Sequence, residues 1–298
     1  MKYLDPVALA RIKGLRHRIF NAGAESSVSG AHKSVSRGFS QEFAVHKQYH
    51  PGDETKFIDW KVYGRKDRYY VKEFQEERSL RLYLLVDASA SMAFSGPGPA
   101  PAKWEYACRL AVSSAFLSML QGDYCGLMIF SDSSKAEMLP GNSMANIERI
   151  DSALAGISPS GTTDFARTLE GLLAGVKRRS AFMLISDMMS PDMLEGIRML
   201  TGKKHSAFVF HLLDLAERDF NWKGNVEFDD METGEKIQCR PSAIRELYRS
   251  EFDKWVRACE SGCRSAGAAY CRTYTDIPPD IALSRILSGV NKTLRGAK

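Results

Sequence analysis

From residue 80 onward, two kinds of hydrophobic pattern alternate along the chain. Short continuous apolar runs, typical of strands buried on both faces, occur at 80–86, 125–130, 181–186, 207–213 and 269–274. Apolar residues recur at three- and four-residue spacing over 103–120, 143–155, 164–176, 192–200, 242–266 and 281–290, which predicts helices. This alternation predicts an α/β fold, in which a doubly wound, mainly parallel sheet carries helices on both faces.

Residues before 80 follow a different pattern. A helix is predicted over 6–20, a loop rich in glycine and serine over 21–40, and short strands at 43–45 and 69–74. We therefore expect an N-terminal segment, residues 1–78, docked on a core domain, residues 79–298. Within the core, a hairpin insertion around Thr233 and Gly234 is predicted over 225–239, and Ser242 is a candidate N-cap of the helix that follows.

Composition places the chain among soluble globular proteins. Its 298 residues are 44% hydrophobic and 26% charged. No stretch approaches the roughly 20 apolar residues of a membrane helix, and no secretory signal precedes the first helix. We therefore expect a cytoplasmic protein without a membrane span, whose six cysteines are reduced thiols.

The net charge of +5 resides in the first 80 residues, because the remainder carries equal numbers of basic and acidic side chains. A basic surface of this kind could attract an acidic partner or a nucleic acid. We favour the alternative that it is a solvated face with a few ion pairs. No helix-turn-helix, zinc or RNP-type motif accompanies it, so nucleic-acid binding is not expected.

Candidate metal ligands follow the predicted strands. Asp87, Ser89 and Ser91 come directly after the run 80–86, and Asp187 follows the run 181–186. Thr163 lies in a loop before a predicted helix. In a parallel sheet these side chains would converge at the carboxyl edge, where ligands bind. Oxygen ligands suit a hard cation such as Mg2+, with Mn2+ or Ca2+ as alternatives. The competing interpretation makes the serines ordinary loop or cap residues.

The order of these residues resembles the metal-ion-dependent adhesion site of the von Willebrand factor A domain, also called the integrin I-domain fold. That pattern reads D-x-S-x-S, then T, then D, and it matches Asp87, Ser89, Ser91, Thr163 and Asp187. The resemblance implies that the hydroxyls coordinate Mg2+ directly and the carboxylates directly or through water. Thr162 stands where the family has a second glycine. Because the hydroxyls are neutral, the ion keeps much of its positive charge. One of its coordination positions then stays open for a partner's Asp or Glu.

A second resemblance covers residues 29–92. The segments Gly52-Asp53, Ile58-Asp59-Trp60 and Glu77-Arg78, together with the hairpin Asp230–Glu235, are similar to the domain-of-unknown-function family 58 (DUF 58). That family implies a von Willebrand factor A-like domain and association with a MoxR-type AAA+ ATPase. Asp53, Asp59, Arg65 and Arg78 are interpreted as an ion-pair network that docks this segment, or as a second surface for the ATPase. Tyr49 and Trp60 are expected to be packing residues.

The sequence therefore predicts a non-enzymatic interaction module that binds a partner carboxylate through Mg2+ and acts as an adaptor for a MoxR-type AAA+ ATPase. The alternative is a metal-dependent hydrolase, because phosphatases of the haloacid dehalogenase class also place an aspartate after an apolar strand. Such phosphatases need a second aspartate two residues further on, where this chain has Ser89. No Walker loop, nucleophile elbow or H-E-x-x-H motif is present.

Overall fold

The computed structural model describes residues 1–4, 11, 42–49, 58–66, 68–75 and 79–286. Its contacts divide the chain into two units, Gly30–Ser79 and a core unit of Met1–Ser29 with Leu80–Lys298. The helix predicted over 6–20 and the loop over 21–40 lie outside the described residues, apart from Arg11. Docking of the N-terminal segment on the core stays a prediction.

The smaller unit contains an antiparallel pair and one short helix. The strands β1 (Glu42–Gln48) and β2 (Tyr70–Gln75) lie where short strands are predicted, and α3 (Trp60–Lys66) is a helix that the pattern did not predict. Asp59 is buried and accepts a hydrogen bond from Val62 N, at the start of α3. Trp60 contacts two tyrosine rings edge-on and is 64% exposed. Asp53 and Arg78 lie outside the described residues.

The core unit is built on a six-stranded sheet. Its strands are β3 (Arg81–Asp87), β4 (Tyr124–Phe130), β5 (Ser134–Gly141), β6 (Ala181–Ser186), β7 (Ser206–Leu213) and β10 (Ala269–Tyr274). Their order is β10-β7-β6-β3-β4-β5, and every pair is parallel except β4–β5. This confirms the predicted doubly wound, mainly parallel sheet. The edge strand β5 was not predicted, because it is half-exposed, polar and contains a proline.

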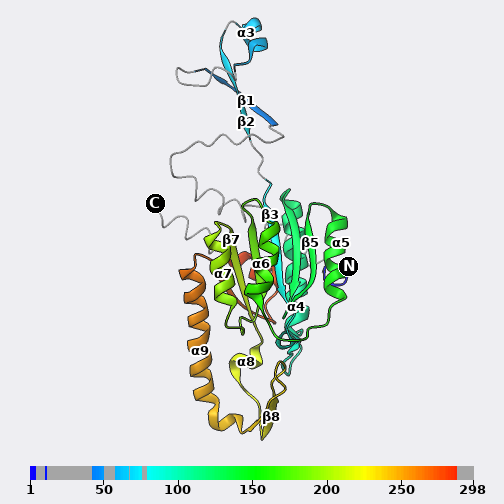
Figure 1. Cartoon of the computed structure of the whole chain (residues 1–298), viewed down its shortest axis with the longest axis vertical. Helices are drawn as coiled ribbons and strands as arrows, with labels where there is room; N and C mark the ends of the chain where they lie inside the picture. The colour runs from blue at the N-terminus through cyan, green and yellow to red at the C-terminus, as the bar shows by residue number, and fades with distance from the viewer. Residues whose placement is uncertain (5–10, 12–41, 50–57, 67, 76–78, 287–298) are drawn as a thin grey trace. The chain divides into compact units, whose positions relative to one another are not determined.

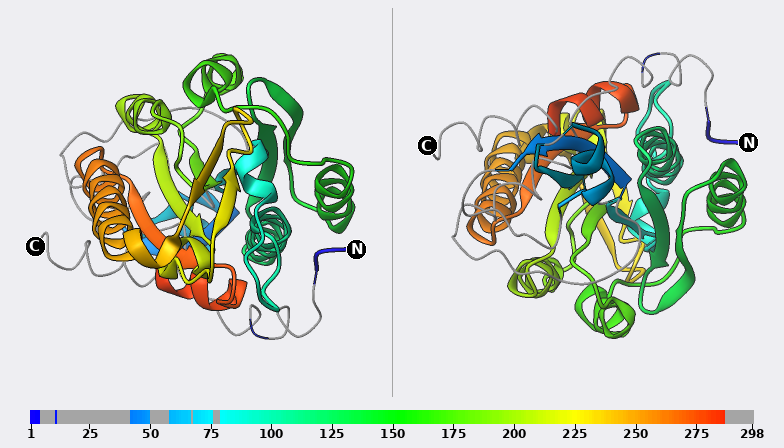
Figure 2. Two further views of the ribbon diagram at one scale, coloured as in Figure 1. Left: turned by 90° about the horizontal axis from the view of Figure 1, so that it is seen from below. Right: turned by 90° about the horizontal axis from the view of Figure 1, so that it is seen from above.

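Helices cover both faces of this sheet (Figures 1 and 2). One face carries α4 (Lys103–Leu120), α5 (Met144–Ala155) and a helix over 279–286; the other carries α6 (Phe165–Gly175), α7 (Met193–Gly202) and α9 (Pro241–Ser265). The expected cap at Ser242 is wrong. Arg240 occupies the N-cap position, and Ser242 lies inside the helix because Pro241 takes its first position.

Two apolar clusters sandwich the sheet. Along β3, Leu84 and Val86 belong to the cluster under α4 and α5, whereas Tyr83 and Leu85 belong to the cluster under α6 and α7. All four side chains are buried. Burial on both faces is the reason that these strands read as continuous apolar runs instead of alternating patterns.

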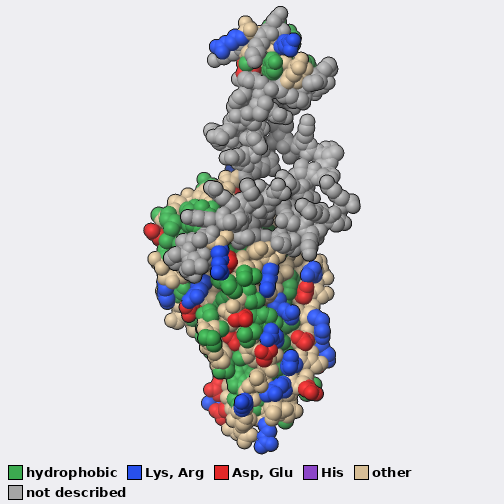
Figure 3. All heavy atoms as spheres, turned by 180° about the vertical axis from the view of Figure 1, so that it is seen from behind, with side chains coloured by type: hydrophobic (Ala, Val, Ile, Leu, Met, Phe, Trp, Pro, Cys, Tyr) green, Lys and Arg blue, Asp and Glu red, His purple; other side chains and the backbone are tan. Residues whose placement is uncertain are grey.

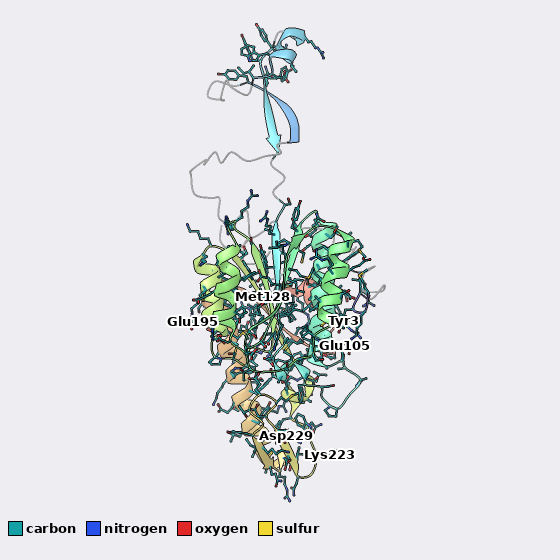
Figure 4. The ribbon with its side chains drawn as sticks, turned by 45° about the vertical axis from the view of Figure 1, so that its right-hand side comes forward. Tyr3, Glu105, Met128, Glu195, Lys223 and Asp229 are labelled. Carbon is teal, nitrogen blue, oxygen red and sulfur yellow. The ribbon has the colours of Figure 1, made fainter. Side chains whose placement is uncertain are left out.

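A smaller lobe extends from the carboxyl edge of the sheet. It contains α8 (Leu215–Asp219), the start of α9, and the predicted hairpin, formed by β8 (Val226–Asp229) and β9 (Lys236–Cys239). Phe220 stacks on Tyr248 of α9 and on Phe228 of β8, which fastens the hairpin to the helix. Figure 4 shows Lys223 and Asp229 in this lobe, separated in space from Met128 in the sheet.

Basic and acidic side chains are interspersed on the face of the core unit shown in Figure 3. All six cysteines are free thiols, and five of them are buried. Within the described part of the chain, no helix combines the length and apolar character needed to cross a membrane.

Candidate functional site

The candidate site lies at the switch point of the sheet, where the order in which the chain adds strands reverses. Strand β3 pairs with β4 on one side and with β6 on the other, and the chain runs from β3 to β4 before it returns to β6. A switch point of this kind opens a crevice at the carboxyl edge of the sheet. Asp87 ends β3 and Asp187 follows β6, so both carboxylates lie at this edge.

Asp87 is completely buried and held in place by its neighbours. Its Oδ1 accepts a hydrogen bond from Ser89 N at 2.9 Å, and its Oδ2 accepts one from Ser186 Oγ at 2.7 Å. The hydroxyls of Ser89 and Ser91 lie 3.1 Å apart at the start of η2 (Ala90–Ala93). Burial opposes the charge of Asp187, but Lys103 and, to a smaller extent, the Ser91 hydroxyl keep the pKa of that carboxyl below its usual value. The turn after β3 therefore presents two hydroxyls between two carboxylates.

The loop that carries Thr163 is tied to this turn through its backbone. Ser160 N donates to Ala88 O, and Ala90 N donates to Gly161 O, each at 2.9 Å. Gly161 has a φ of +80°, a conformation that a glycine adopts without strain. Thr163 follows two residues later and is half-buried. Backbone hydrogen bonds thus place its loop beside the end of β3, and the ligand role of its side chain stays a prediction.

A buried lysine occupies the centre of the site. Lys103 is 1% exposed, and its Nζ donates to Asp187 Oδ2 and to Glu217 Oε1, both at 2.8 Å. Burial opposes the charge of Lys103, but the two carboxylates raise its pKa above the usual value. Burial likewise opposes the charge of Asp187, but the ammonium holds the pKa of Asp187 below its usual value. Glu217 Oε2 accepts from Asp214 N and so caps α8 at the same time.

The site holds more negative than positive charge. Burial and the charge of Asp187 raise the pKa of Asp87 to about 7. The carboxylates of Asp187 and Glu217 share the ammonium of Lys103, and no basic side chain is bonded to Asp87 among the described residues. In the part of the chain that is described, no group of three or more His, Cys, Asp or Glu side chains is arranged to hold a metal, so a cation here must draw on hydroxyl ligands. The donor set of hydroxyls and carboxylates with excess negative charge fits a hard divalent ion.

Sequence reasoning missed three participants: Ser186, Lys103 and Glu217. Two signals could have found Lys103 and Glu217. Lys103 is the first residue of its helix, where the helix dipole disfavours a cation, so a lysine there indicates a nearby anionic partner. Asp214 and Glu217 have the spacing of a capping box, which marks a short helix at the end of β7.

Comparisons with known proteins identify relatives of this chain. A family model described as "Protein of unknown function DUF58" matches residues 46–260. The uncharacterized protein Rv1480 of Mycobacterium tuberculosis (strain ATCC 25618 / H37Rv) is 24% identical over 259 residues, which cover 85% of this chain and 79% of Rv1480.

Solved structures resemble the chain more loosely. The conserved hypothetical protein BatB from Bacteroides thetaiotaomicron has 15% identity and a TM-score of 0.48, covering 72% of this chain and 100% of BatB. The SpRpn10 VWA domain has 15% identity and a TM-score of 0.35, covering 46% of this chain and 77% of that domain.

Proposed function

The chain belongs to the family described as "Protein of unknown function DUF58", and from that premise we propose that it is a non-enzymatic protein-interaction module. In this proposal a divalent cation at the carboxyl edge of the sheet binds an Asp or Glu of a partner protein. One observation carries the proposal: two buried carboxylates and two hydroxyls meet at the switch point of the sheet, and the ammonium of Lys103 is bonded to one of these carboxylates.

Five residues would hold the cation: Asp87, Ser89, Ser91, Thr163 and Asp187. The bound ion, Mg2+ or alternatively Mn2+ or Ca2+, would supply a Lewis acid with one position free for an external carboxylate. The hydroxyls add no charge of their own, so the ion keeps its attraction for an anionic partner. The chain's contribution is to fix the ligands, because Asp87 is locked by Ser186 and Asp187 by Lys103.

The partner that we propose is a MoxR-type AAA+ ATPase, for which this chain would act as an adaptor. The support is the similarity of the segments around Asp53 and Asp59 to the family. A metal-dependent hydrolase is the competing function. We favour binding because the position two residues after Asp87, where the haloacid dehalogenase phosphatases need an acid, holds Ser89.

A metal titration tests the first part of the proposal. Isothermal titration calorimetry with Mg2+ should give a single site in the wild type, and Asp87→Asn should weaken it by about 10–100-fold or more, since even residues outside the ligand shell change metal affinity by that factor. Asp164→Asn is the matched control, because Asp164 neighbours Thr163 but is not a proposed ligand. Equal Mg2+ affinity for both variants would refute the site.

A binding assay with purified proteins tests the second part. The MoxR-type ATPase itself uses Mg2+, so the comparison is made at constant Mg2+ between the wild type, Asp87→Asn and Asp164→Asn. Loss of binding in Asp87→Asn alone is expected. Hydrolysis of p-nitrophenyl phosphate that requires Mg2+ and disappears in Asp87→Asn would instead establish the hydrolase.

A further inference from the structure

A pocket of about 740 Å³ opens beyond the ends of β7 and β10. Its walls include the loop 96–101, the first residues of α8 and the segment 275–280. Its volume falls within the range of about 300–1,000 Å³ that is typical of ligand-binding sites. None of the residues that line it is a proposed metal ligand, so the pocket is a separate feature of the core unit.

The walls of this pocket are stiff and packed against one another. Five prolines contribute to them: Pro97, Pro99, Pro101, Pro278 and Pro279. A Cβ at Gly96 would lie 2.7 Å from Ala216 Cβ, so the loop backbone packs directly against α8. Asp214 is buried and accepts hydrogen bonds from Ala216 N at 2.8 Å and from Thr275 Oγ1 at 3.0 Å. Since the walls are fixed before a ligand arrives, binding would cost little conformational entropy.

One buried carboxylate in the pocket wall lacks a hydrogen bond. Asp280 is 9% exposed, and within the described residues the only polar partner of its carboxylate is Arg11, whose Nη1 lies 3.9 Å from Oδ2. That distance is too long for a hydrogen bond. The first turn of the helix over 279–286 favours a negative charge at Asp280, but a buried carboxylate without a close counter-charge is costly. Asp280 can therefore accept hydrogen bonds from a cationic ligand.

A second carboxylate in the pocket wall is also available. Asp276 is exposed, and none of the described residues forms a hydrogen bond or an ion pair with its side chain. Two other charged groups of the wall are already engaged. Asp219 accepts hydrogen bonds from Arg218 at 2.6 and 3.0 Å. Arg109 donates to Glu105 at 2.6 Å. The charge that the pocket offers to a ligand is therefore negative.

Arg11 indicates which cation suits this pocket. Its side chain lines the pocket but is 57% exposed, so it neutralises Asp280 only in part. A guanidinium is planar, is always charged and can donate to carboxylates through several N–H groups at once. The prolines and the half-buried ring of Trp222 offer apolar surface to the aliphatic stem that carries such a group.

We propose that this pocket binds an arginine side chain of a partner protein, with Asp280 and Asp276 as the acceptors of its guanidinium. Arg11 is then a weak internal competitor, which a better-placed arginine replaces. A protein-borne arginine is favoured over a free guanidino compound because the guanidinium observed at the pocket is itself carried by a polypeptide. This inference does not depend on the proposed metal centre, because the two sites share no ligand residue.

Titration of the full chain with acetyl-arginine methylamide tests this inference. The readout is the NMR shift of the indole N–H of Trp222, which lines the pocket and is assigned with Trp222→Phe. Saturable binding to the wild type is expected. Asp280→Asn should weaken it about tenfold or more, the effect of losing a hydrogen bond between charged groups. Arg11→Gln should strengthen it about twofold to fivefold, because a largely exposed ion pair competes only weakly.

The controls isolate the pocket and the charge of the ligand. Asp253→Asn removes an exposed carboxylate of α9 outside the pocket, and Arg167→Gln removes an arginine that also lies 3.9 Å from an aspartate; both should bind the probe as the wild type does. Acetyl-citrulline methylamide, in which a neutral urea replaces the guanidinium, should give no saturable shift. Asp276→Asn changes an exposed residue, so it tests the pocket even if Asp280→Asn fails to fold, and it should weaken binding about threefold.

Each outcome supports or overturns the inference. Absence of saturable binding in both the wild type and Arg11→Gln would refute the pocket as an arginine site, and so would equal binding of the arginine and citrulline probes. Unchanged affinity in Asp280→Asn and Asp276→Asn would refute these residues as the acceptors. If agmatine, a free guanidino compound, binds more than about tenfold more tightly than the arginine probe, the protein-borne ligand is wrong.

Discussion

Replacing Lys103 by methionine should remove a buried electrostatic contribution to the stability of the core unit. Lys103 is 1% exposed and donates to Asp187, which is also 1% exposed, and to Glu217, whose side chain is 12% exposed. Methionine fills a similar volume but leaves two buried carboxylates without a counter-charge. Breaking a buried ion pair from one side costs about 3–5 kcal/mol, so we expect Lys103→Met to lower the free energy of unfolding by that amount.

Urea denaturation at pH 7.5 in EDTA measures this loss. The folded pKa of Lys103 is raised, so its stabilising effect is complete below its unfolded pKa of about 10 and is lost only at higher pH. The pKa of Asp187 is lowered, so its effect is present above about pH 4. At roughly 2–4 °C for each kcal/mol in a domain of 150–250 residues, the melting temperature should fall by about 6–20 °C.

A surface lysine provides the control for this experiment. Lys254 pairs with Glu251 at 2.7 Å, with both side chains about 60% exposed, so Lys254→Met should cost less than about 1 kcal/mol. Saturating Mg2+ should restore part of the stability of Lys103→Met, because a cation at the proposed site would neutralise Asp187. A loss in EDTA no larger than that of Lys254→Met would show that the Lys103 pairs contribute little, and the reasoning would be wrong.

Three further predictions concern packing, pH and helix capping. A Cβ at Gly196 would lie 2.5 Å from the Phe165 ring, whereas Gly171 has open space around it. In thermal melts Gly196→Ala should therefore destabilise by about 1–3 kcal/mol and Gly171→Ala stabilise by up to about 1 kcal/mol; equal effects would contradict the packing. Burial raises the pKa of Asp123 to about 6, so this carboxyl lowers the stability of the wild type as the pH rises from about 4 to 6. Denaturation across this range should show Asp123→Asn gaining roughly 3 kcal/mol by pH 7 and nothing at pH 4; a constant difference would refute this. Ser143 Oγ accepts from the backbone at the start of α5, so Ser143→Ala should cost about 1 kcal/mol in urea denaturation, and no loss would argue against the cap.

The sequence by itself determined the central part of the fold. The helix 103–120 and the strands 181–186 and 269–274 have the bounds predicted from their patterns, because they are buried on one or both faces and carry a continuous or periodic apolar signal. The prediction of secondary structure from the sequence failed where the apolar signal is weak. The edge strand β5 is polar, α3 is short, and α9 begins one residue before the predicted Ser242 because Pro241 starts the helix.

The sequence also placed Asp87, Ser89, Ser91 and Asp187 at strand ends, and the parallel pairing of β3 with β6 brought them to one edge. Only the tertiary structure decided what surrounds them. Lys103 meets Asp187 and Glu217 across 84 and 114 residues of sequence, and Ser186 meets Asp87 across 99. Local patterns report which face of an element is buried, but they carry no information on which distant charges share a buried site. The balance of charge around the candidate metal site was therefore visible only in the folded chain.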